Sequence, residues 1–428
     1  MKVTRPTKDA KNFPFNGKRL SLSLVVLVGS LANFYAPISR IAVAQKPIGT
    51  GASRVVSADE ARYIELSQQA EETDHQEANR LQPTSAGVSG QTQQQSGRIV
   101  SSGKAFDPTK MESYLKQELT KEGAVGFSYA IVQSGQLVKS GAQGWARASW
   151  EGKPLNPDPN AQKQPSVMLT ATKRMTVASI SKPITAVAVM KLVEQKKLSL
   201  DDKFYPLIKN KFPLAGKGVE NVTIRQLLTH TSGLKAGVGC SNLPGLLSQG
   251  TSGNSYNYEN SNFCLLREVI EKVSGQNYVN YVQSEILSKM TIGDMSCQPD
   301  VNNPTLYYNT SKTLGKLWGD YSDTCSAYGW YASATDLAKF LAYIRYHKVL
   351  SKPTTDQMLS EGLGWKKTIG TRGTYYQHGG DWIASENKGF TGVIMHFPDN
   401  IDAVVLVNTR GDFNKTTLLK NAYEAAFK

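Results

Sequence analysis

The residues most able to carry out chemistry are a serine and a lysine three positions apart, Ser179 and Lys182. A serine hydroxyl is a poor nucleophile unless a base within reach takes its proton as it attacks. The surrounding pattern predicts the first turn of a helix, where positions i and i+3 share a face and developing negative charge is favoured. The same spacing recurs at Ser101 and Lys104 in a stretch with no predicted fold. The pair by itself therefore fits an ordinary helix cap better than a nucleophile.

The context of the pair is a series of short blocks that follow in one order. They are Ser179-Ile180-Ser181-Lys182-Pro183, the stretch at 197–202, the run Thr223-Ile224-Arg225-Gln226-Leu227-Leu228-Thr229-His230-Thr231-Ser232-Gly233-Leu234, the blocks at 258–260, 271–275 and 331–337, and His378-Gly379-Gly380. In order and spacing these blocks resemble the serine β-lactamase family of class C type, with its β-lactamases, DD-peptidases and penicillin-binding proteins. The resemblance covers about residue 106 to the C-terminus and favours the nucleophile over the helix cap.

The resemblance implies three catalytic side chains. Ser179 matches the serine that becomes acylated, Lys182 its lysine partner, and Tyr258 the tyrosine that exchanges protons with the nucleophile or leaving group. Because closely coupled groups titrate as a pair, the sequence leaves open whether the lysine or the tyrosine is the base. Tyr278 and Tyr307 also fit the Tyr-x-Asn pattern, but Tyr258 alone lies in a Gly/Ser/Asn-rich loop before a predicted helix. We expect a core role for Tyr278 and a surface loop for Tyr307.

Five further residues match substrate-binding positions. Asn260 matches the asparagine that orients the substrate amide and the lysine, and His378 stands where class C β-lactamases have lysine and several DD-peptidases have histidine. Gly379 and Gly380 complete that block. The family usually has a threonine at the position of Gly379, and the hydroxyl of that threonine helps to bind a substrate carboxylate. The backbone N–H groups of the nucleophile and of Asp381 match the oxyanion hole, which stabilises the tetrahedral intermediate.

The implied function is hydrolysis through an acyl-enzyme, and histidine at position 378 favours a D-amino-acid-specific peptidase of DD-carboxypeptidase type. The missing hydroxyl weakens the DD-carboxypeptidase and β-lactamase hypotheses but leaves the acyl-transfer groups intact. A class C type β-lactamase or a carboxylesterase is the alternative, and a non-catalytic penicillin-binding-like envelope protein is the alternative from another class. The expected partner is a peptidoglycan-like peptide, a β-lactam or an ester. No cofactor is implied, and no His/Cys/Asp/Glu cluster has the spacing of metal ligands.

The elements that must position these residues follow from apolar periodicity. Residues 111–119 repeat at helical spacing, and two alternating runs around Ser134-Gly135 predict a hairpin. Residues 185–342 are mainly helical by pattern, strands return at 389–395 and 403–407 around a turn at 398–400, and an amphipathic helix at 415–427 closes the chain. We predict an α+β domain, β-lactamase/transpeptidase-like by resemblance. Its antiparallel sheet is built from both ends of the domain, flanked by helices, with a helical subdomain.

The N-terminal segment predicts export to the periplasm or the extracellular medium. Residues 1–44 place a basic stretch before an apolar run at 20–28, the pattern of a signal peptide. The run is shorter than the ~20 residues of a spanning helix, so no integral membrane span is expected, with an uncleaved anchor as the alternative. Residues 45–104 are Gln/Ser-rich and predict a disordered linker, which leaves 105–428 as the hydrolase domain.

The cysteines and the charge fit an exported protein. Cys240, Cys264, Cys297 and Cys325 are too far apart for a Cys-x-x-Cys metal site, and in an oxidising compartment they indicate two disulfides with three possible connectivities. Sequential pairing is favoured, and four buried thiols are the alternative. The formal charge of +14 is scattered, without an arginine-rich helix, so we predict a solvated surface and no nucleic-acid binding.

Overall fold

The structure, a computed structural model, describes residues 105–151, 166–234 and 239–428. The signal peptide expected at 1–44 and the linker expected at 45–104 lie outside the described residues. Every element below therefore falls within the stretch expected to form the hydrolase domain. None of the helices in the described ranges is both long and apolar enough to span a membrane.

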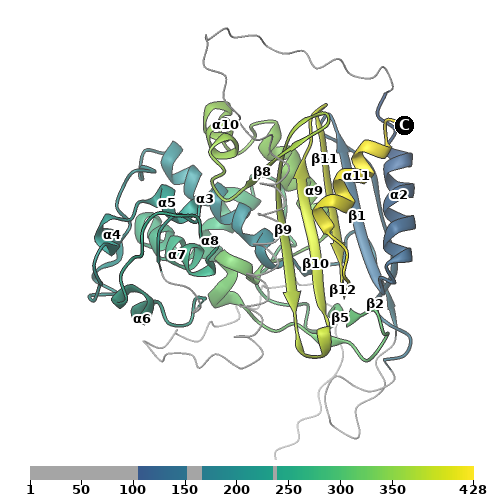
Figure 1. Ribbon diagram of the computed structural model, residues 1–428, viewed down its shortest axis with the longest axis horizontal. Coiled ribbons are helices and arrows are strands. Elements are labelled where there is room, and N and C mark those ends of the chain that lie inside the picture. The colour runs from purple at the N-terminus through teal and green to yellow at the C-terminus, as the bar shows by residue number, and fades with distance from the viewer. Residues whose placement is uncertain (1–104, 152–165, 235–238) are drawn as a thin grey trace, which may run out of the picture. The chain divides into compact units, whose positions relative to one another are not determined.

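A central antiparallel sheet is assembled from the two ends of the domain (Figure 1). Its strands are β1 (Gly126–Gln133), β2 (Gln136–Arg147), β8 (Lys366–Gly370), β9 (Gly373–Ile383), β10 (Gly389–His396) and β11 (Ile401–Val407). They pair in the order β8-β9-β10-β11-β1-β2, so the N-terminal hairpin joins the C-terminal one where β1 meets β11. Both predicted hairpins are confirmed, whereas β8 carried no recognised signal in the sequence.

Helices cover both faces of this sheet. α2 (Pro108–Lys121) and α11 (Lys415–Ala425) pack together on one face, and α9 (Ala334–Arg345) packs on the other (Figure 1). β11 lies between these layers and is buried along its whole length, as expected for a strand covered on both sides. Its side chains alternate, with Val405 in the core under α2 and α11 and Val404 in the larger core under the helical subdomain.

The helical subdomain lies between β2 and β8 in the chain. Its helices are α3 (Ser181–Glu194), α4 (Tyr205–Ile208), α5 (Ile224–Leu228), α6 (Leu243–Ser248), α7 (Asn260–Ser274), α8 (Tyr278–Val282) and α10 (Lys352–Ser360). Shorter helical turns are η1 (Ala178–Ile180), η2 (Val219–Asn221), η3 (Gln283–Leu287), η4 (Ser322–Thr324), η5 (Cys325–Gly329) and, beyond β9, η6 (Ser385–Asn387). α3 buries eleven of its fourteen residues, so it is the central helix of this half.

The predicted helical stretch also contains strands. The short strands of the fold are β3 (Val167–Met168), β4 (Met175–Thr176), β5 (Leu306–Asn309), β6 (Lys316–Leu317), β7 (Tyr331–Ala332) and β12 (Thr409–Arg410). β5 pairs in parallel with β12, so the complete sheet is mixed. The expectation of a surface loop for Tyr307 is wrong, because it lies fully buried in β5 and its hydroxyl accepts a hydrogen bond from Thr176 N at 2.7 Å. A four-residue strand is too short to show a period.

Two disulfides join the cysteines in the order favoured by the sequence. Cys240 pairs with Cys264, with 5.3 Å between their Cα atoms, and Cys297 pairs with Cys325, with 5.7 Å. Cys264 lies within α7 and Cys325 begins η5. Each disulfide therefore ties a loop to an element that contributes to the site described next.

Candidate active site

Ser179 lies in the 3₁₀ turn η1, directly before α3. Its neighbour Ala178 has a φ of 45°, a left-handed conformation that costs a residue with a side chain about 1–3 kcal/mol. Ser181 holds the turn, since its hydroxyl donates to Ala178 O at 2.7 Å and accepts from Trp330 N at 3.1 Å. The sequence predicts Ser179 in the first turn of the α-helix, whereas the helix begins two residues later, at Ser181. The 3₁₀ turn still places Ser179 and Lys182 on the same side.

The side chain of Lys182 is fully buried, and its Nζ lies 3.0 Å from Ser179 Oγ. Two other oxygens surround the amine, Asn260 Oδ1 at 2.7 Å and the carbonyl of Ala327 at 3.0 Å. An ammonium ion has three donors, so it can satisfy all three oxygens. A neutral amine can instead donate to Asn260 and Ala327 and turn its lone pair to the Ser179 hydroxyl. The oxygens around Lys182 can therefore hold both its protonated and its neutral form, the two states that proton transfer requires.

Tyr258 lies in the loop two residues before α7, and Asn260 is the first residue of that helix. Tyr258 is buried, and the centroid of its ring lies 4.7 Å from Lys182 Nζ, within the range of a cation–π attraction. The structure thus brings the hydroxyl of Ser179 and the ring of Tyr258 to the amine of Lys182. The competing Tyr278 has the expected core role, because its hydroxyl bonds to Thr185 Oγ1 at 2.7 Å within the helical subdomain.

His230, from the family-like run at 223–234, contacts the loop that carries Tyr258. Its Nδ1 accepts a hydrogen bond from Glu259 N at 3.1 Å, and its ring centroid lies 4.4 Å from that of Tyr258. Since a backbone N–H can only donate, Nδ1 carries the lone pair of a neutral imidazole. His230 itself has a left-handed φ of 57°. Its ring packs against that of Tyr258, and its Nδ1 holds the backbone of the next residue.

His378 lies on β9 with its ring centroid 6.4 Å from that of Tyr258. Burial and the positive charges of Lys366 and Lys182 hold the pKa of His378 well below its usual range. Its Nδ1 lies 2.7 Å from Gly379 O, and because a carbonyl only accepts, Nδ1 carries the proton. The histidine is therefore neutral and has an acceptor at Nε2, whereas a lysine at this position would present a cation.

Gly380 allows β9 to approach the nucleophile. A β-carbon at Gly380 would lie 2.3 Å from Val177 O and 3.2 Å from Ser179 N, so the strand passes against the turn η1. The backbone of residues 380 and 381 therefore runs beside the amide of Ser179. This is the arrangement expected for two oxyanion-hole donors on neighbouring segments.

Positions 379 and 381, on either side of Gly380, face the opposite side of the sheet. Asp381 is buried there and accepts hydrogen bonds from Lys415 Nζ at 2.6 Å and Thr391 Oγ1 at 2.5 Å. Burial alone would raise the pKa of Asp381, but Lys415 and Arg410 lower it below its usual value. A β-carbon at Gly379 would lie 2.2 Å from Lys415 Cε. The ion pair of Lys415 thus occupies the space next to Gly379, where the family usually has threonine.

Lys366 is the residue of this region that the sequence did not identify. It begins β8, and its Nζ lies 5.6 Å from the centroid of the Tyr258 ring. With Tyr258, His378 and His230 it lines a small pocket of about 30 Å³. No motif contains Lys366, and only the pairing of β8 with β9 brings it to the cleft. Among the described residues, no group of three His, Cys, Asp or Glu side chains could hold a metal ion.

Comparisons with known proteins agree with this geometry. The sequence matches the family described as Beta-lactamase over residues 111–427. The protein PbpX of Bacillus subtilis (strain 168) is 25% identical over 289 residues, which are 63% of this chain and 67% of PbpX. Two other curated relatives match over 27% and 39% of their own length. The chain thus spans from about a quarter to two thirds of the length of these three relatives.

Solved structures show the same fold. A class C β-lactamase superposes with a TM-score of 0.60 at 17% identity, covering 75% of this chain and 96% of that one. A D-stereospecific amidohydrolase from Streptomyces sp. superposes with a TM-score of 0.57 at 20% identity, covering 74% of this chain and 98% of that one. At these identities the likeness concerns the fold.

Proposed function

The chain belongs to the beta-lactamase family, and we propose that it is an exported serine hydrolase working through an acyl-enzyme at Ser179. One observation carries the proposal: the buried Nζ of Lys182 lies 3.0 Å from Ser179 Oγ, inside a cage of fixed acceptors. A buried amine in hydrogen-bond contact with a serine hydroxyl is the arrangement that activates such a nucleophile. We infer that the substrate is an amide or peptide of a D-amino acid.

The proposed reaction has two halves with the same proton carriers. Ser179 Oγ bonds to the carbonyl carbon while its proton passes to the pair formed by Lys182 and Tyr258. The bond to the leaving amine breaks, and the pair returns that proton to the amine nitrogen. Water then attacks the ester, gives a proton to the pair, and the Ser179 oxygen regains a proton as the acid leaves. No net proton stays on the enzyme.

The oxyanion of each tetrahedral intermediate is assigned to the backbone amides of Ser179 and Asp381. The close passage of Gly380 along η1 supports this assignment, because it leaves no side chain between the two segments. Donors that are fixed before the reaction stabilise the developing charge without reorganisation, and removing one typically costs about 10²–10³ in rate. Asn260, which already holds Lys182 through its Oδ1, is assigned to orient the substrate amide as well.

The substrate class is inferred from the charges beside the nucleophile. His378 is neutral because of burial and nearby lysines, so it offers an acceptor to a substrate N–H rather than a cation to a carboxylate. Lys366 is the cation assigned to a terminal carboxylate, since it lines the pocket with Tyr258 and His378. The similar fold of a D-stereospecific amidohydrolase supports a D-amino-acid substrate. Class C type β-lactamase activity is the alternative on the same residues.

Esterase activity is the second candidate, and the surroundings of Gly379 favour it. Gly379 has no side chain, so the site lacks the hydroxyl that helps the family to bind carboxylates. Lys415, held by Asp381, occupies the space next to Gly379. A neutral ester needs no such group. Export is proposed from the basic and apolar N-terminal pattern and from the two disulfides. Cell fractionation of the full chain tests it.

Four substrates would separate these activities: a fluorescent penicillin, an N-acyl-D-alanyl-D-alanine, its L-alanyl counterpart and p-nitrophenyl acetate. Lasting penicillin labelling with cleavage of the D-peptide supports the peptidase, and fast penicillin turnover supports the β-lactamase. Ester cleavage alone supports the esterase. If the folded chain processes none of the four, a non-catalytic envelope protein replaces the proposal.

The serine is tested by Ser179→Ala, with Ser181→Ala as the matched control in the same turn. Ser179→Ala should abolish labelling and turnover while leaving the thermal midpoint close to that of the wild type. Ser181→Ala removes two buried hydrogen bonds and should lower the free energy of unfolding by about 1–3 kcal/mol while labelling persists. Retained activity in Ser179→Ala would remove the assignment.

The role of Lys366 is tested with two forms of the D-peptide, one with a free carboxylate and one amidated. Lys366→Met should raise KM for the carboxylate form by about 10–100-fold, which is the range of a charge-assisted hydrogen bond. KM for the amidated form should stay unchanged. An equal effect on both forms would assign Lys366 to the shape of the pocket instead.

A further inference from the structure

The part of β9 that passes the nucleophile has a neighbouring strand on one side only. β8 pairs with β9 as far as Gln377, whereas β10 continues to pair with it as far as Ile383. Among the described strands, residues 378–383 therefore have a partner only in β10. The amide of Asp381, assigned above to the oxyanion hole, belongs to this stretch. A catalytic donor has to stay within about 0.5 Å of its working position, so this edge needs a further support.

The side chain of Asp381 supplies such a support. Its Oδ2 accepts a hydrogen bond from Lys415 Nζ at 2.6 Å, and its Oδ1 accepts one from Thr391 Oγ1 at 2.5 Å. Arg410 Nη1 lies 3.8 Å from the same Oδ1. The side chains of Lys415 and Asp381 are 6% and 2% exposed, so water hardly screens the attraction between their charges. The carboxylate is thus tied to three elements, β10, β12 and α11.

The glycine at position 379 makes room for this lysine. A β-carbon at Gly379 would lie 2.2 Å from Lys415 Cε and 3.1 Å from its Nζ, so a side chain there would displace the lysine. Glycine inside a strand weakens the strand, and a buried ion pair is often no more stabilising than apolar side chains of the same volume. Two features that add little stability therefore meet beside the oxyanion hole, as expected where a function maintains them.

We propose that Lys415 is a positioning residue, which fixes the backbone amide of Asp381 in the oxyanion hole through the buried ion pair. This inference rests on the proposed function, since the oxyanion hole acts only if the acyl-enzyme forms. Lys415 begins α11 and approaches from the face of the sheet that α11 covers (Figure 1). Ser179 meets the other face of β9 at Gly380. The lysine therefore acts through the strand and not on the substrate.

The test is a double variant that combines Asp381→Asn with Lys415→Met. Both charges leave together and the side chains keep nearly their size, so no unpaired charge stays buried and the protein should fold. Acylation by the fluorescent penicillin should slow by about 10–100-fold. This is less than the 10²–10³ typical for loss of an oxyanion donor, because the amide is displaced rather than removed. Unchanged acylation in this variant would overturn the proposal.

Two further measurements separate positioning from a purely structural role. For the substrate that the wild type turns over, kcat of the double variant should fall while KM stays nearly unchanged, because oxyanion donors act mainly in the transition state. Phenylboronic acid forms a tetrahedral adduct with a reactive serine, and its affinity should weaken by a factor similar to that for kcat. A loss of folded protein alone would leave the affinity of the remaining sites at the wild-type value, which would contradict positioning.

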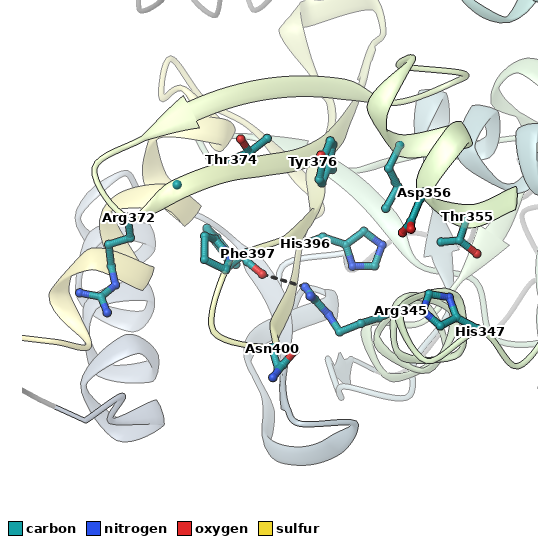
Figure 2. A pocket seen from close by; sticks show the side chains of 13 residues that line it. Arg345, His347, Thr355, Asp356, Arg372, Thr374, Tyr376, His396, Phe397 and Asn400 are labelled. Carbon is teal, nitrogen blue, oxygen red and sulfur yellow. Dashed lines mark hydrogen bonds between the residues drawn. The ribbon is translucent and has the colours of Figure 1, made fainter. Parts of the chain in front are cut away.

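Another buried ion pair of the same sheet provides the matched control. Arg345 Nη2 lies 2.6 Å from Asp402 Oδ1, at the opposite end of β10 and β11. Figure 2 shows Arg345 with its hydrogen bond to Phe397 O, which measures 2.8 Å. Arg345→Met combined with Asp402→Asn removes the same kind of pair, but penicillin acylation and boronic acid affinity should keep their wild-type values. Equal slowing in the two double variants would overturn the proposal.

Lys415→Gln decides the question if the double variant does not fold. It leaves the carboxylate of Asp381 with Thr391, Arg410 and a neutral amide donor, so this variant should fold. Acylation should slow by about 3–10-fold, the difference between a charged and a neutral hydrogen bond, and a wild-type rate would refute the role of Lys415. If the wild type itself forms no acyl-enzyme, the proposed function fails. If the wild type is acylated and the variants match it, only the inference about Lys415 fails.

Discussion

Two buried histidines on the same face of the sheet differ in what surrounds them. His378 on β9 pairs in register with Ile394, two residues before His396 on β10. Both rings are neutral, and both keep the proton on Nδ1. His378 is held by the carbonyl of Gly379, whereas His396 is held by a carboxylate that also binds an arginine.

The difference shows how charge pairing sets the electrostatic environment of a buried imidazole. Around His378 the charges that lower its pKa are the lysines 366, 182 and 415, so the catalytic cleft is a positive environment suited to an oxyanion. Beside His396 the cation Arg345 is paired with the carboxylate of Asp402, so the field is balanced. The same imidazole state thus lies in a positive environment in one place and in a balanced one in the other.

The largest expected effect comes from removing the hydroxyl of Tyr258, which belongs to the region around His378. Tyr258→Phe keeps the ring against His230 and Lys182 and removes the proton carrier, so kcat/KM should fall by about 10²–10⁴. Tyr278→Phe is the control, because that tyrosine is a core residue with the same Tyr-x-Asn pattern. An equal loss of activity in both variants would contradict the assignment.

The next effect tests whether the disulfides serve the catalytic cleft alone. Replacing Cys240 and Cys264 by alanine removes a cross-link worth about 3 kcal/mol in the chain-entropy model, which guanidinium unfolding measures. Because Cys264 belongs to α7, which carries Asn260, amide exchange should accelerate there first. Amides of β10 and β11 in the central sheet should keep their protection. Uniform acceleration would show that the two regions open as one unit.

A smaller effect is expected from a single methyl group at the closest backbone approach. Gly380→Ala would place its β-carbon 2.3 Å from Val177 O, so β9 and η1 must separate at a cost of about 1–3 kcal/mol. Penicillin acylation should slow at least tenfold, because the oxyanion donors move apart. Gly293→Ala is the control, since its β-carbon would meet nothing within 4 Å. Unchanged acylation in Gly380→Ala would argue against the assigned oxyanion hole.

The smallest effect is the pH dependence of stability from the two histidines. Both have pKa values below the ordinary value of 6.5, so below about pH 6.5 the unfolded chain binds protons that the folded chain does not. The free energy of unfolding should therefore fall as pH falls, by up to about 1.4 kcal/mol per pH unit for each histidine. The contribution of His378 should persist to lower pH, because its shift is larger.

Urea unfolding of the wild type, His378→Asn and His396→Asn between pH 7.5 and 5 measures these slopes. Each variant should lose part of the slope below pH 6.5 and have the wild-type slope above it. The buried carboxyls Asp381 and Asp402 have lowered pKa values, so they contribute below about pH 4. A wild-type slope in both variants would mean that other groups titrate in this window.

The structure agrees with the sequence where a pattern is local. The stripe from Met111 to Leu119 predicted α2, and the three-residue spacing of Ser179 and Lys182 survives although Ser179 lies in a 3₁₀ turn rather than in the helix. The two-residue and four-residue strands were missed because they are shorter than a period. Tyr307 was misplaced for the same reason, since burial of a short strand depends on its partners.

The sequence by itself determined the family, the catalytic side chains to expect and the helices and hairpins that carry them, because these depend on residue type and short-range spacing. Only the tertiary structure decided that His378 is neutral, that the charges of Lys366 and Lys415 act on it, and that His396 meets Asp402. These properties arise from strand register and burial. Electrostatic interactions act between neighbours in space, which distance along the chain does not record.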